Sequence, residues 1–72
     1  MDDYVLKEFT ELKTARDFFA IAAANAALDY VDRLDIGLKR EACELRLNKL
    51  KEMLKNYRMA NQAYYDWLRK HK

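Results

Sequence analysis

The chain contains no proline, and its only glycine, Gly37, lies almost at the midpoint of the 72 residues. Folds rich in strands or loops need turn-forming residues at regular intervals, because Gly, Pro, Asn and Asp set the backbone angles of tight turns. A single break near the middle instead favours one long helix on each side of it. The sequence is also rich in Ala, Leu, Lys, Glu and Arg, which are strong helix formers. We therefore predict an all-α fold.

The residues around Gly37 set the expected boundaries. Glycine readily adopts the left-handed backbone conformation that closes a helix. We expect one helical domain over 1–72, with helix 1 at about 3–35, a bend at 35–38 and helix 2 at about 38–69. The two long helices would form an antiparallel hairpin. An alternative is a short extra N-terminal helix that ends near residues 10–14, because Thr14 with Asp17 resembles a capping box.

Both predicted helices carry apolar residues at alternating steps of three and four, the spacing that keeps one stripe of a helix facing a partner helix. The predicted helix-packing or dimer seam of helix 1 contains Phe9, Leu12, Phe19, Ala23, Ala26 and Tyr30. The seam of helix 2 contains Cys43, Leu47, Leu50, Leu54, Tyr57, Asn61, Tyr64 and Leu68. Beside it lies a second stripe of Met53, Ala60 and Trp67. This wider apolar face suits a bundle of several helices.

A chain of this length buries only about 60% of the surface that its unfolded form exposes, so its fold needs additional support. The lone Cys43 cannot form an internal disulfide, and the lone His71 cannot make a Cys/His metal cluster. Self-association is the remaining means of support. Six alanines between positions 20 and 27 also leave helix 1 smooth enough to contact two neighbours. We predict a homodimer in which two hairpins form a four-helix bundle.

Charge is divided unevenly between the two halves. Residues 1–36 carry four Lys/Arg and eight Asp/Glu, a net charge of −4, whereas residues 37–72 carry ten and four, a net charge of +6. An acidic helix folded against a basic one gains complementary pairs along its edges. The charge division therefore favours the antiparallel hairpin.

The sequence offers little for catalysis. It lacks a glycine-rich phosphate loop, a nucleophile motif and a metal-binding signature, so we expect no enzymatic activity, cofactor, metal or small-molecule substrate. The most apolar run, 18–28, has eleven residues, far fewer than the roughly 20 that span a bilayer. We expect no membrane segment. A single cysteine is typical of a reducing compartment, and we expect a cytoplasmic protein.

The C-terminal half supplies the candidate binding residues, because basic and aromatic side chains alternate along it. The candidate surface for a partner protein or nucleic acid contains Arg46, Lys49, Lys55, Arg58, Tyr65, Trp67, Arg69 and Lys70. The leading hypothesis is a small regulatory or adaptor protein that binds another protein through its helices. The alternative is a nucleic-acid-binding dimer, since basic side chains neutralise phosphates and aromatic rings stack on unpaired bases.

The plan resembles that of the Rop family of plasmid copy-number regulators, on the basis of Leu34-Asp35 before the bend and Cys43-Glu44 after it. That resemblance implies a two-helix hairpin that dimerises into a four-helix bundle and binds paired RNA loops. The RNA-contacting face of that family lies on its first helices, whereas residues 1–36 are acidic here. The resemblance therefore extends to architecture and leaves function to be argued from the residues.

Overall fold

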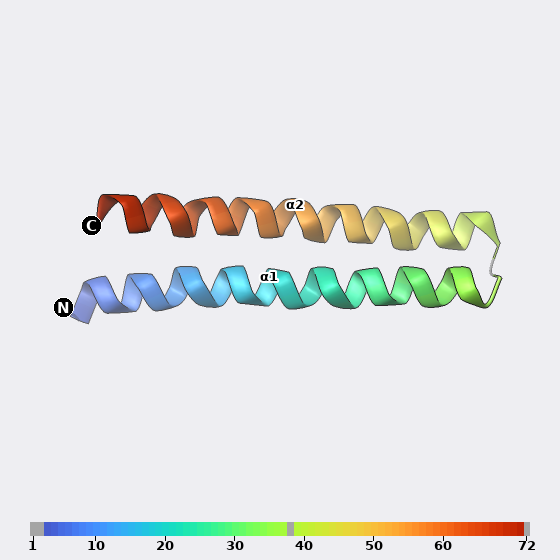
Figure 1. The fold of residues 1–72 in the computed structure, drawn as a ribbon, viewed down its shortest axis with the longest axis horizontal. Coiled ribbons are helices and arrows are strands. Elements are labelled where there is room, and N and C mark those ends of the chain that lie inside the picture. Colours follow the sequence, from blue (N-terminus) through green and yellow to red (C-terminus); the bar gives the residue numbers. More distant parts are fainter. Residues whose placement is uncertain (1–2, 38, 72) are drawn as a thin grey trace.

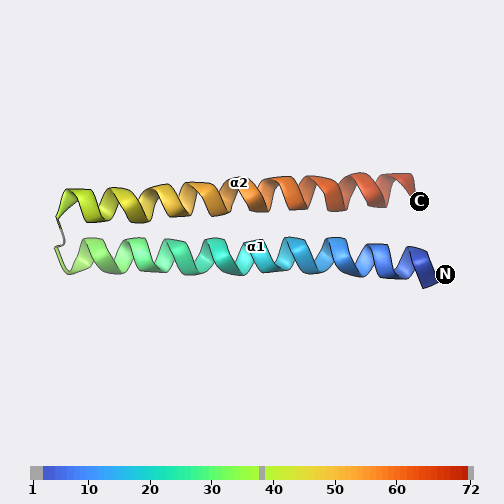
Figure 2. The same cartoon turned by 180° about the vertical axis from the view of Figure 1, so that it is seen from behind.

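The computed structural model describes residues 3–37 and 39–71 and places them in two antiparallel helices, α1 (Asp3–Asp35) and α2 (Arg40–Lys70). The helices lie side by side over their whole length, with both chain ends at the same end of the hairpin (Figures 1 and 2). The molecule is a rod with extents of 53 × 15 × 13 Å. The described residues contain no strand, so the predicted all-α hairpin is confirmed. The alternative break at residues 10–14 is absent, because α1 runs through them without interruption.

The bend between the helices depends on Gly37, which has φ = +71°, in the left-handed region. Its N–H donates to the carbonyl of Leu34 at 3.1 Å, and the N–H of Ile36 donates to the carbonyl of Asp32 at 3.2 Å. These hydrogen bonds satisfy carbonyl groups that the end of α1 would otherwise leave without partners. The sequence therefore identified the residue that closes the first helix.

The second helix begins at Arg40 rather than near residue 38. Leu38, the expected start, lies outside the described residues. Lys39 has φ = −56° and ψ = 147°, which is extended backbone, and its side chain makes no capping hydrogen bond. Its carbonyl accepts hydrogen bonds from the N–H groups of Ala42 and Cys43 at 3.0 and 3.2 Å. Lys39 therefore precedes α2 as a cap residue without a side-chain cap.

The core between the helices is thin. Among the described residues only Ala23, Cys43 and Trp67 are buried, and no large side chain is completely buried. Every other residue of the predicted seam is half-buried, and none of them is exposed. The three-and-four spacing thus coincides with residues that are buried or half-buried in the hairpin.

Candidate interaction surfaces

An aromatic cluster lies near the open end of the hairpin, between the first turns of α1 and the last turns of α2. Phe9 of α1 packs against Tyr64 and Trp67 of α2, with ring centroids 5.8 and 5.5 Å apart. The guanidinium of Arg16 lies 4.3 Å from the Tyr64 ring centroid, a cation–π distance. His71 stacks on Trp67 at 4.1 Å. The cluster therefore ties the ends of both helices together.

The acidic and basic helices are joined directly by an ion pair at the other half of the hairpin. Arg46 Nε of α2 lies 2.8 Å from Asp29 Oδ2 of α1. That N–H is buried without a hydrogen bond, so the contact is a close charge pair with poor hydrogen-bond geometry. Asp29 also accepts a hydrogen bond from Arg33 at 3.3 Å. The complementary charges of the two halves thus meet in at least one contact between the helices.

A second apolar stripe lies on the side of α1 that faces away from α2. We call it the outer stripe, and it consists of Phe18, Ile21, Asn25 and Leu28, at steps of three, four and three. The side chains of Phe18, Ile21 and Leu28 are 64%, 63% and 64% exposed. At about 100° per residue, these positions lie almost opposite the half-buried Leu12 and Phe19. The hairpin alone therefore leaves a complete helix-packing stripe uncovered.

Carboxylates border the outer stripe. On the helical wheel of α1, Glu11, Asp17, Asp29, Asp32 and Asp35 lie within about 60° of its centre. Lys13, Arg16 and Arg33 lie about 100° or more from that centre, whereas Lys7, one turn before Glu11, lies within about 20° of it beyond the N-terminal end of the stripe. Asp17 pairs with Arg16 at 3.0 Å and Asp29 pairs with Arg33 and Arg46, whereas the other three carboxylates are on exposed residues. The outer stripe is therefore an apolar strip with an acidic border.

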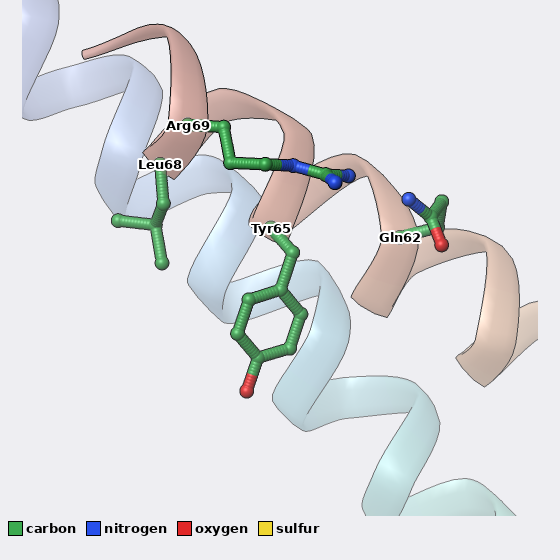
Figure 3. Close-up of a pocket in the computed structure, with 4 residues that line it drawn as sticks. All are labelled: Gln62, Tyr65, Leu68 and Arg69. Atoms are coloured by element: carbon green, nitrogen blue, oxygen red, sulfur yellow. The ribbon is translucent and has the colours of Figure 1, made fainter. Parts of the chain in front are cut away.

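The exposed side of α2 has a different character. Its basic stripe consists of exposed residues at alternating steps of four and three, namely Lys51, Lys55, Arg58, Gln62, Tyr65 and Arg69. A shallow pocket at its C-terminal end is lined by Gln62, Tyr65, Leu68 and Arg69. Figure 3 shows Arg69 extending along α2 toward Gln62, while Tyr65 and Leu68 point to the side of α1. This stripe presents positive charge together with one exposed aromatic ring.

One carboxylate lies beside the basic stripe. Asp66 accepts a hydrogen bond from Gln62 Nε2 at 2.9 Å and pairs with Arg69. The hydrogen bond from Gln62 and then the charge and hydrogen bond of Arg69 hold the pKa of Asp66 below the usual value of an aspartate. Arg69 is therefore partly neutralised, and the positive charge of the basic stripe comes mainly from Lys51, Lys55 and Arg58.

The structure places most of the predicted binding residues on the surface, but it corrects two of them. Lys49, Lys55, Arg58, Tyr65, Arg69 and Lys70 are exposed. Trp67 is only 7% exposed, because it packs against Phe9 inside the hairpin. Arg46 is half-buried beside Asp29. These two side chains stabilise the hairpin and are not part of an open binding surface.

The outer stripe was not singled out in the sequence, although its spacing was visible there. Helix 1 is apolar on all sides between residues 18 and 28, so two seams fit equally well, one through Phe19 and Ala23 and the other through Phe18 and Ile21. The acidic border was the additional feature that could have marked the second seam as a separate surface.

Within residues 3–37 and 39–71, no group of three or more His, Cys, Asp or Glu side chains is arranged to hold a metal ion. Neither described helix has a stretch that is long and apolar enough to cross a membrane. Comparison with family models, curated proteins and solved structures gives no match. The function is therefore argued from the outer stripe and the basic stripe.

Proposed function

We propose that this chain is a small, non-enzymatic regulatory or adaptor protein that acts through helix-mediated protein–protein interaction. The outer stripe of α1 carries the proposal. Three large apolar side chains at helix-packing spacing, each more than 60% exposed, are typical of a surface that another helix covers. Cytoplasmic residence belongs to the proposal, and a chain with a single cysteine, which forms no internal disulfide, is consistent with it.

We also propose that two hairpins associate as a four-helix bundle. The thin core supports this, because a second hairpin would bury the half-buried residues along the α1–α2 line. Each helix of such a bundle has its two neighbours about 90° apart. The outer stripe of α1 points almost directly away from α2, so bundle formation leaves it available to a further partner.

Nucleic-acid binding through the basic stripe is the second candidate function. Lys51, Lys55 and Arg58 are exposed along one side of α2, and Tyr65 adds a ring that is 52% exposed. This combination suits phosphate contacts with base stacking. It supports the candidate less strongly than the outer stripe supports protein binding, because Asp66 partly neutralises Arg69 and the stripe is short.

The deciding experiment is affinity capture from a cell lysate with the tagged full chain, with and without nuclease, followed by mass spectrometry. The proposal predicts protein partners that remain after nuclease treatment. Partners that disappear with nuclease, together with direct nucleic-acid binding whose affinity falls steeply with salt, would support the second candidate instead. A charge-reduced variant, Lys55→Gln with Arg58→Gln, serves as the matched control, because it weakens nucleic-acid binding and leaves the outer stripe intact.

A further inference from the structure

We infer that the outer stripe of α1 binds an amphipathic helix whose apolar face is bordered by Lys or Arg side chains. This inference rests on the proposed function and deepens it, because it names the surface and the chemistry of the partner. The geometry points to a helix as the occupant. Phe18, Ile21 and Leu28 present anchors about three turns long on a straight, continuous helix.

The acidic border specifies the charge of the partner. Glu11 lies seven residues before Phe18, and Asp35 lies seven residues after Leu28, so carboxylates stand at both ends of the stripe. Asp32 continues the stripe itself, four residues after Leu28, and is exposed. A bound helix with basic flanking residues would face these carboxylates, whereas acidic flanks would be repelled. Asn25, in the middle of the stripe, would favour one register by requiring a polar group opposite it.

The same charges disfavour a second copy of α1 as the occupant. In an antiparallel pair that matches Phe18 with Leu28 of the second copy, Glu11 would stand opposite Asp35 of that copy, because the two intervals are equal. In a parallel pair each carboxylate would stand opposite its own counterpart. Both arrangements place like charges together. The four-helix bundle does not cover the stripe either, since its contacts lie on the sides of the hairpin.

The exposed surface of α2 does not offer an equivalent apolar stripe. The most exposed large apolar side chains of α2 are Leu45 and Met59, at 65% and 63%. They stand fourteen residues apart, too far to form one anchor pair. They therefore provide a matched control with nearly the same exposed apolar area as Ile21 and Leu28.

The test uses the full chain and two designed helical peptides of about three heptads, followed by fluorescence anisotropy. Both peptides carry Leu or Ile at the packing positions; one carries Lys at the flanking positions and its twin carries Glu. The Lys peptide is expected to bind about tenfold or more tightly than the Glu twin, with a preference that weakens as salt is added. Equal affinity for the two peptides, or no binding of either, would overturn the inference.

Variants then assign the surface. Ile21→Gln with Leu28→Gln should weaken binding of the Lys peptide about tenfold or more, whereas Leu45→Gln with Met59→Gln should leave it unchanged. Asp32→Asn with Asp35→Asn should weaken the Lys peptide and strengthen the Glu twin. Circular dichroism of each variant verifies that the hairpin is folded. Equal loss in the α2 control pair, or a homodimer that the Ile21 and Leu28 changes abolish, would show that the stripe is not a site for a basic helix.

Failure of this inference is distinguishable from failure of the proposed function. If the Ile21→Gln, Leu28→Gln variant still captures the nuclease-resistant partners, the adaptor function stands and another surface carries it. If nuclease treatment removes the partner proteins captured by the unmodified chain, the adaptor function itself fails.

Discussion

At the open end of the hairpin, Trp67 packs on Phe9 of the other helix and is one of the three described residues that are buried. Truncating a large buried aromatic side chain costs about 3–5 kcal/mol, which is comparable to the whole stability of a small domain. We expect Trp67→Ala to unfold most of the protein, as measured by urea denaturation with circular dichroism.

Trp67→Phe is the matched control for that measurement. The indole Nε1 is buried without a hydrogen-bond partner, so its removal costs less than the loss of the ring. We expect this variant to remain folded and to lose about 1 kcal/mol. A loss below about 1 kcal/mol for Trp67→Ala would contradict the central place given to the aromatic cluster.

Asp66 provides a pH-dependent prediction at the same scale. Its pKa is lowered in the folded protein, first by the hydrogen bond from Gln62 and then by Arg69. A carboxyl group whose pKa is lower when folded adds stability above its unfolded pKa of about 4, and this stability is lost as the pH falls through the folded value. We expect Gln62→Ala to raise the pKa of Asp66 toward the usual value, as measured by NMR titration. Asn48→Ala, an exposed change elsewhere on α2, should leave that pKa unchanged.

At the scale of the helices, Gly37 determines where α1 stops. A Cβ at this position would meet nothing within 4 Å, so a substitution is opposed only by the left-handed backbone with φ = +71°. We expect Gly37→Ala to lower the free energy of unfolding by about 1 kcal/mol. Gly37→Asn should cost less, since Asn adopts this conformation more readily. Equal urea midpoints for all three proteins would contradict this account.

The elements also show what the sequence could and could not predict. The three-and-four spacing of residues such as Leu12 and Leu50 was sufficient to predict both helices, and the residues at this spacing are buried or half-buried. Spacing could not place Trp67, which lies beside the seam, since a large amphipathic ring suits both a core and a surface. Nor could it choose a face for residues 18–28, because apolar side chains surround the helix there.

For the molecule as a whole, thinness is the dominant property. The rod is only 13–15 Å across, and only three of the described residues are buried, so large apolar side chains such as Phe18 and Leu28 remain exposed. The proposed four-helix bundle would cover the sides of the hairpin, and the proposed basic helix would cover the outer stripe of α1. If both proposals hold, the two surfaces act independently, and this independence can be measured.

If the hairpin dimerises as proposed, folding and association are linked, and Tm must rise with protein concentration. We expect a rise of about 5–10 °C over a hundredfold increase in concentration, with a dimer mass in sedimentation equilibrium. The variant Ile21→Gln with Leu28→Gln should show the same rise, because the outer stripe points away from the bundle. A concentration-independent Tm with a monomer mass would contradict the dimer. If this variant alone lost the rise in Tm with concentration, the dimer contact would lie on the outer stripe of α1. That result would contradict the four-helix bundle.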